Sequence, residues 1–155
     1  MKIRLKKFKK VKSTNDIALK LIKRNISGPI LITSEKQTGG RGRFGKKWVS
    51  KKGNLFISIY FKLDKIKINF KQFAILNAFL IKKIIYKNFS KKIKIKWPND
   101  LLFEKKKICG ILQETISKAE KKFLIVGIGI NTNLNPNNSS FSSTSLKQIT
   151  NKNID

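Results

Sequence analysis

Two arginines stand close together in a glycine-rich segment of this chain. The chain has 36 basic residues, yet only four are arginine, and Arg41 and Arg43 lie within the segment 39–45, which also holds four of the nine glycines. A guanidinium group forms a planar, bidentate pair with phosphate or carboxylate that a lysine ammonium does not reproduce. Glycine lets the backbone of such a segment approach an anion closely. The segment predicts an anion-binding loop, although taken alone it is equally compatible with a flexible basic turn. Its spacing matches neither the phosphate-binding loop of the Lys-Ser/Thr type nor the dinucleotide fingerprint.

A second candidate is Lys96, which ends an alternating segment before Pro98-Asn99-Asp100. A lysine at a strand end can neutralise the charge of a phosphoryl group during its transfer. The structural alternative is an ordinary turn, with Trp97 in the core and Lys96 in solvent. For this segment alone the structural alternative is favoured.

Other polar and glycine positions allow the same two interpretations. Residues 13–15, Ser-Thr-Asn, are explained by a helix cap, or they bind a neutral polar group near the helix start. Glycines at 127 and 129 inside an apolar segment indicate a close approach of backbone or ligand. Gly110 has the same ambiguity, and Asn131 either orients a phosphate or ribose or merely ends the strand.

The elements that must position these residues are mixed. Alternating or β-branched segments predict strands over 3–11, 30–33, 55–61, 93–97, 107–115 and 122–130. Helical spacing predicts helices that begin near Ser13, over 70–87 and near 145–149. This order indicates an α+β domain with a mixed, mainly antiparallel sheet and helices packed on it.

Composition excludes several classes of site. The chain has no histidine, so imidazole general bases, Ser-His triads and His-ligated zinc are absent. A lone Cys109 cannot form an internal disulfide, and no apolar run is long enough to cross a bilayer. The formal net charge of +28 is spread over every segment, which indicates a compositional bias more than a selected nucleic-acid stripe.

The order and spacing of these motifs resemble those of the biotin protein ligases. The similarity extends from about Ser13 to Asn131 and is weaker over 143–146. It rests on six segments: 13–15, 37–48, 54–56, 96–100, 107–112 and 127–131. Gly-Arg-Gly-Arg followed by Lys-Trp-Pro-Asn-Asp is its most specific part. The resemblance implies that residues 1–155 form a single catalytic domain of the biotin/lipoate ligase type, similar to class II synthetases.

The resemblance also implies a two-step reaction and its partners. The carboxylate of biotin attacks the α-phosphate of ATP, with Mg²⁺, and gives biotinyl-5′-adenylate. A lysine of a biotin carboxyl carrier protein, a subunit of acetyl-CoA carboxylase, then takes the biotinyl group. Loop closure would protect the adenylate from water.

Site residues are carried over by motif. Lys96 and Arg43 are expected to be catalytic, whereas no metal ligand is indicated. Biotin is expected to contact Ser13, Thr14, Asn15, Gln37, Arg41, Gly42, Arg43 and Lys96. The nucleotide is expected to contact Arg41, Arg43, Trp48, Lys96 and Asn131.

The sequence differs from the family pattern at both ends. Nothing resembles the DNA-binding helix-turn-helix of some members, so no specific DNA binding is expected. We also expect the usual small C-terminal β-domain of the family to be lacking. We expect a cytoplasmic enzyme without membrane contact, with a homodimer possible. The alternatives are a lipoate or octanoate ligase of the same fold, a basic nucleic-acid-binding module, and a truncated biotin-binding paralogue with little activity.

Overall fold

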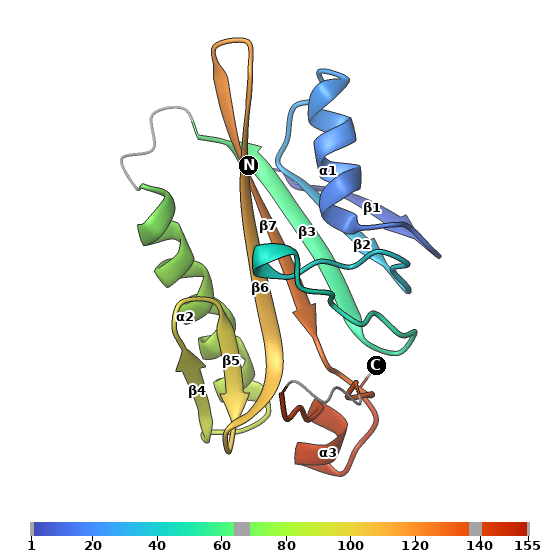
Figure 1. Cartoon of the computed structure of the whole chain (residues 1–155), viewed down its shortest axis with the longest axis vertical. Coiled ribbons are helices and arrows are strands. Elements are labelled where there is room, and N and C mark those ends of the chain that lie inside the picture. The colour runs from blue at the N-terminus through green and yellow to red at the C-terminus, as the bar shows by residue number, and fades with distance from the viewer. Residues whose placement is uncertain (1, 64–68, 137–140, 155) are drawn as a thin grey trace.

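The strands of the chain form a seven-stranded sheet (Figure 1). The structure is a computed structural model and describes residues 2–63, 69–136 and 141–154. The strand order is β1-β2-β3-β7-β6-β5-β4, and β1 and β2 are its one parallel pair. The elements are β1 (Arg4–Phe8), α1 (Thr14–Lys23), β2 (Ile30–Ser34), a 3₁₀ turn (Arg43–Gly45), β3 (Leu55–Lys62), α2 (Phe70–Asn88), β4 (Ile93–Lys96), β5 (Asp100–Phe103), β6 (Lys106–Lys118), β7 (Lys121–Ile130) and α3 (Leu146–Thr150). The predicted α+β class with a mainly antiparallel sheet is confirmed.

Two features near the Lys-Trp-Pro-Asn-Asp motif differ from the sequence predictions. Asp100 was expected in a turn, but it opens β5, a four-residue strand that pairs with both β4 and β6. A strand this short is held by its neighbours in the ladder, which the local sequence does not reveal. Trp97 lies in the turn and is 60% exposed, so the core position considered for it is wrong.

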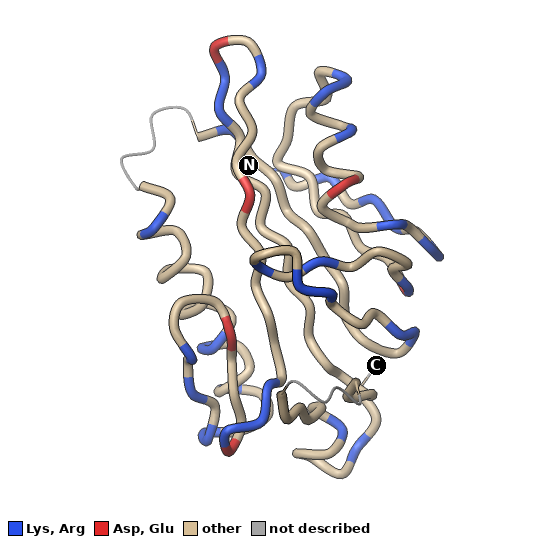
Figure 2. The backbone as a smooth tube through the Cα atoms, viewed as in Figure 1, with Lys and Arg blue, Asp and Glu red and all other residues tan. Residues whose placement is uncertain are grey.

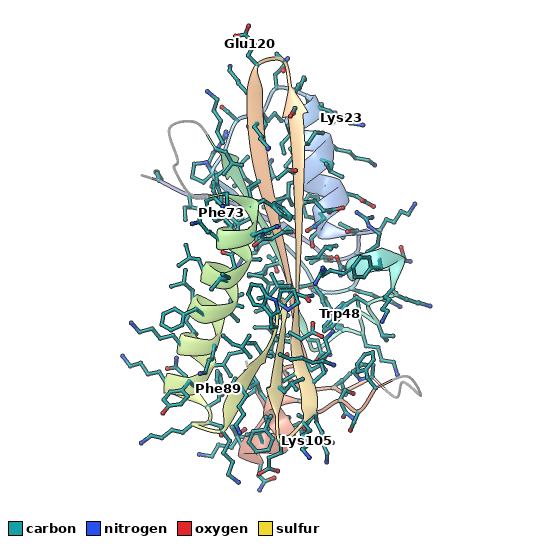
Figure 3. The ribbon with its side chains drawn as sticks, turned by 60° about the vertical axis from the view of Figure 1, so that its left-hand side comes forward. Lys23, Trp48, Phe73, Phe89, Lys105 and Glu120 are labelled. Atoms are coloured by element: carbon teal, nitrogen blue, oxygen red, sulfur yellow. The ribbon has the colours of Figure 1, made fainter. Side chains whose placement is uncertain are left out.

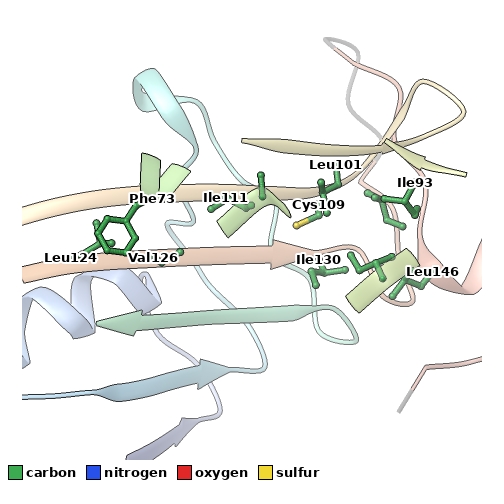
Figure 4. Close-up of a cluster of buried hydrophobic side chains, with 12 residues drawn as sticks. Phe73, Ile93, Leu101, Cys109, Ile111, Leu124, Val126, Ile130 and Leu146 are labelled. Atoms are coloured by element: carbon green, nitrogen blue, oxygen red, sulfur yellow. The ribbon is translucent and has the colours of Figure 1, made fainter. Parts of the chain in front are cut away.

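Alternation along β7 places α1 and α2 on opposite faces of the sheet. Leu124 and Val126 belong to the hydrophobic cluster under α2 (Figure 4), whereas Phe123 and Ile125 belong to the cluster under α1. Successive side chains of a strand point to opposite faces, so each helix has a core of its own. Cys109 lies in the α2 cluster, and burial raises the pKa of its thiol. This thiol is therefore a core residue and not a nucleophile.

Helix α2 begins with a capping box and buries one stripe against the sheet. Asn69 accepts a hydrogen bond from the amide of Gln72, and the Gln72 side chain accepts one from the amide of Asn69. Ile85 is 1% exposed in the α2 cluster, whereas its neighbour Ile84 is 60% exposed. Within the described ranges, no helix has the length and hydrophobicity to cross a bilayer.

Replacing Ile85 by alanine is expected to lower the free energy of unfolding by about 2–5 kcal/mol, because it removes buried methyl groups and leaves a cavity. Ile84→Ala is the matched control, with the same chemical change one residue earlier on the exposed side. Urea unfolding followed by circular dichroism measures both variants. Equal destabilisation of the two would contradict the packing described for α2.

Candidate active site

A row of aligned residues forms the centre of the site. The strand registers place one residue from each of five neighbouring strands in line across the sheet: Lys96, Asp100, Gly110, Gly129 and Phe56. Aligned residues of paired strands direct their side chains to the same face. The two glycines therefore leave a gap without side chains between Asp100 and Phe56.

We call Gly110, Gly127 and Gly129 the glycine floor, because each leaves space that another side chain fills. A Cβ atom at Gly129 would lie 2.4 Å from Nε1 of Trp48, and one at Gly110 would lie 2.8 Å from Cζ3 of the same indole. A Cβ atom at Gly127 would lie 2.4 Å from Oδ1 of Asn15. A close approach therefore occurs at these glycines, but side chains make it, and not the backbone or ligand that the sequence prediction named.

Residues 37–48, here called the arginine loop, run over the floor to Trp48 (Figure 3). The amide of Trp48 donates to the carbonyl of Gly40 over 2.9 Å, and the amide of Gly42 donates to the carbonyl of Lys46 over 2.6 Å. These bonds fold the loop back on itself, with Phe44 exposed at its end. The loop is therefore built as a turn with an ordered base.

The face of the sheet that carries the floor also carries a cavity of about 630 Å³. Nine of the ten site residues predicted from the sequence line it: Ser13, Thr14, Asn15, Gln37, Arg41, Gly42, Arg43, Trp48 and Lys96. The tenth, Asn131, is buried and is not among the lining residues, and its Nδ2 donates to the carbonyl of Thr144 over 3.1 Å. Nine of the residues expected at one site are thus brought together, whereas Asn131 lies outside the lining of the cavity.

One end of the cavity is polar and neutral. The amide and hydroxyl of Thr14 both donate to Oε1 of Gln37, over 2.8 and 3.1 Å, and Nε2 of Gln37 donates to Ser50 over 2.9 Å. Ser13 occupies the N-cap position of α1, yet its hydroxyl makes no capping hydrogen bond. Capping therefore does not account for Ser13, and its hydroxyl is available to a ligand.

Lysine and arginine side chains gather at the other end. Nζ of Lys107 lies 2.8 Å from Oδ1 of Asp100, without the direction of a hydrogen bond, and both side chains are 19% exposed. The same ammonium lies 5.3 Å from the centre of the Trp48 ring. Nη1 of Arg43 donates to Oδ1 of Asn99 over 3.3 Å, while Lys96 is exposed.

Lys107 is thus a functional candidate that sequence reasoning did not select. It was noted as the first residue of segment 107–112, but nothing distinguished it from the many other lysines. Its position depends on the pairing of β6 with β5 beside an irregularity at Leu101 and Leu102. The signal in the sequence that could have pointed to Lys107 is its position three residues before Gly110, a glycine inside a strand.

A model of the biotin/lipoate A/B protein ligase family matches residues 7–131. The chain belongs to this family. The match begins in β1 and ends at Asn131, so it includes the arginine loop, the glycine floor and every lining residue named above.

Relatives of this chain include a bifunctional ligase/repressor and a biotin ligase. The bifunctional ligase/repressor BirA of Bacillus subtilis is 35% identical over 127 residues, which are 81% of this chain and 39% of that protein. The biotin–[acetyl-CoA-carboxylase] ligase of Paracoccus denitrificans is 31% identical over 122 residues, 77% of this chain and 50% of that one. The chain therefore spans half or less of the length of these relatives.

The fold of this chain is also similar to that of a solved structure. Biotin protein ligase from Aquifex aeolicus, in complex with biotin and ATP, superimposes with a TM-score of 0.82 at 32% identity. The superposition covers 98% of this chain and 63% of that one. The described sheet and helices are therefore the family's fold.

Gly129→Ala is expected to displace the Trp48 indole, because a methyl group has no space 2.4 Å from Nε1. We also expect a loss of about 1–3 kcal/mol of stability from this overpacking. Acrylamide quenching of Trp48 fluorescence measures the displacement in a Trp97→Phe background, which removes the other tryptophan.

Gly42→Ala is the matched control for this experiment. A Cβ atom at Gly42 would lie 3.4 Å from the nearest atom, the carbonyl oxygen of Lys46, and its φ is −108°. Quenching that rises equally in both variants would show that Trp48 does not rest on the floor.

Proposed function

We propose that this chain catalyses the ATP-dependent ligation of biotin to a carrier protein. The observation that carries the proposal is the polarity of the cavity: neutral hydrogen-bonding groups line one end, and cations line the other. Biotin has the matching polarity, with a neutral ureido ring at one end and a carboxylate at the other. The name of the Paracoccus ligase, which contains biotin, and that of the Aquifex complex with biotin and ATP support the same substrates.

In the first step, a carboxylate oxygen of biotin attacks the α-phosphorus of ATP, and the bond to the pyrophosphate oxygen breaks. Two anions must approach each other, so the barrier falls when fixed cations lie beside them. Arg43, Lys96 and Lys107 would supply this charge from three separate elements. Ser13, Thr14 and Gln37 would hold the ureido ring, which places the carboxylate at the cationic end.

Of the two lysines, Lys107 has the better position for the reacting groups. It lies on the cavity face beside the Trp48 ring, and its pairing with Asp100 restrains its position before a ligand arrives. Lys96 is exposed at the edge of the same cavity, so water screens its charge more strongly. We therefore infer the main catalytic role for Lys107 and a supporting role for Lys96.

Mg²⁺ would enter this site bound to the phosphates of ATP. Within the described ranges, no three Asp, Glu, Cys or His side chains come together as a metal site. Mg²⁺ is commonly held by one or two carboxylates together with substrate phosphates and water. Asp100 is the carboxylate that lines the cavity and would serve as the protein ligand.

In the second step, the amine of a carrier lysine attacks the carbonyl carbon of the mixed anhydride. An amide bond forms, AMP leaves, and the amine releases a proton. The carrier would be the biotin carboxyl carrier protein of acetyl-CoA carboxylase, as the name of the Paracoccus relative suggests. We place the reaction in the cytoplasm, where this carrier and ATP are available.

Biotin-dependent exchange of labelled pyrophosphate into ATP tests the first step. We expect exchange with biotin and little with lipoate, because the neutral end of the cavity presents fixed hydrogen-bonding groups suited to a ureido ring. Exchange that prefers lipoate would instead favour the lipoate ligase alternative. Absence of exchange, with biotin still bound, would favour a binding paralogue.

Alanine substitutions distinguish the proposed roles of Lys107 and Lys96. Lys107→Ala is expected to lower the exchange rate by about 10²–10³-fold, the usual effect of removing one fixed transition-state donor. Lys96→Ala should lower it by about tenfold or less, since its charge is exposed. Lys94→Ala, two residues from Lys96 on β4 and outside the cavity lining, is the control. A larger effect at Lys96 than at Lys107 would reverse the assignment.

A further inference from the structure

Arg41 is already paired with two carboxylates. Its Nη1 lies 2.6 Å from Oδ1 of Asp16, and its Nη2 lies 3.4 Å from Oε1 of Glu114. Partial burial by itself would lower the pKa of Arg41, but the hydrogen bonds and charges of Asp16 and Glu114 raise it above its ordinary value. The guanidinium therefore stays charged, and its charge is balanced within the protein.

Glu114 also connects this arginine to the start of α1. Nδ2 of Asn15 donates to Oε2 of Glu114 over 2.6 Å, while Oδ1 of Asn15 lies within hydrogen-bonding distance of the buried Ser58 hydroxyl. One carboxylate on β6 thus holds both the arginine loop and the first turn of α1. We call Asp16 and Glu114 the carboxylate clamp.

Arg43 lies in a different environment. Its Nη1 donates to the neutral amide oxygen of Asn99, and its guanidinium carbon lies 4.9 Å from the centre of the Phe44 ring. No carboxylate of a described residue forms an ion pair with Arg43. Arg43 therefore presents an unbalanced positive charge to the cavity.

Acidic residues are scarce in this chain, and this scarcity bears on the difference between Arg41 and Arg43. The chain has only eight acidic residues against 36 basic ones, so a carboxylate is a rare neighbour for any cation. Figure 2 shows basic residues along the whole length of the molecule, with few acidic ones among them. Two of the eight nevertheless meet at Arg41, on two different elements. Among the ion pairs of the described residues, Arg41 is thus the cation with two carboxylate partners.

We propose that the two arginines of the loop have separate functions. Arg41 is a positioning residue that the carboxylate clamp uses to fix the arginine loop to α1 and β6, and Arg43 carries the charge available to an anionic ligand. A guanidinium between two carboxylates belongs to a group of net charge −1, so this group as a whole does not attract another anion. The proposal rests on the proposed function for the identity of that anion, the carboxylate of biotin or a phosphate of ATP.

Binding of charged and uncharged biotin distinguishes the two roles. We expect Arg41→Gln to weaken the binding of biotin and of biotin methyl ester by the same factor, about tenfold or more, because the whole neutral end loses its shape. Arg43→Gln should weaken the binding of biotin and leave that of the ester unchanged. Calorimetry measures all four affinities. Weaker binding of biotin alone in Arg41→Gln would overturn the proposal.

A double substitution tests the clamp itself. Arg41→Gln leaves two carboxylates facing each other without a cation, and Glu114→Gln in the same chain removes one of them. The double variant is therefore expected to bind biotin at least about threefold more tightly than Arg41→Gln alone, since coupled residues do not act independently. Losses that simply multiply would contradict the clamp.

Glu120→Gln is the charge-matched control for Glu114→Gln. It removes the same charge from the tip of the β6–β7 hairpin, distant from Trp48 (Figure 3), and is expected to bind biotin like the wild type. Circular dichroism of each variant is the check that it is folded.

A second readout requires no ligand. In the Trp97→Phe background, Arg41→Gln and Glu114→Gln should increase acrylamide quenching of Trp48, whereas Arg43→Gln should not. Failure of the wild type to bind biotin would refute the proposed function alone, because this quenching still tests the clamp. Unchanged quenching in both clamp variants would refute the clamp alone.

Discussion

The absence of side chains at the glycine floor is the constraint on which the site depends. Asn15 and Trp48 come from distant parts of the chain, and both lie in space that a Cβ atom would occupy. Contacts at this distance allow an indole ring and an amide to rest directly on strand backbone. The start of α1 is therefore placed against Gly127, and the end of the arginine loop is placed against Gly110 and Gly129. All three glycines also line the cavity, together with Asn15 and Trp48.

The charges in the cavity follow from the same arrangement. Asp100 lies in the aligned row at the edge of the floor, and it holds Lys107 close to Trp48. Asp16 and Glu114 balance Arg41 near the neutral end, while Arg43 lacks such a partner among the described residues. Positive charge is consequently concentrated at one end of the cavity, although lysines cover the remainder of the molecule. A substrate with one neutral and one anionic end would be oriented by this difference.

Family membership and the geometry of the site support each other without being the same argument. The family model and the Aquifex superposition establish the fold over most of this chain. The fold alone does not choose a substrate, since a lipoate-bound Plasmodium falciparum protein shares it at 15% identity with a TM-score of 0.59. The choice of biotin rests on the polar and charged groups of the cavity and on the names of the relatives.

The sequence by itself predicted the strands and helices that carry the site, except β5, because alternation and helical spacing are properties of neighbouring residues. It also identified nine residues that line one cavity and the strand glycines beneath them. It did not distinguish Lys107 from Lys96, because that difference arises from the register of β6 against β5.

The unequal partners of Arg41 and Arg43 were likewise decided only in the folded chain. Glu114 approaches Arg41 from 73 positions further along the sequence. Pairing across such distances depends on the whole sheet, and no local pattern contains it.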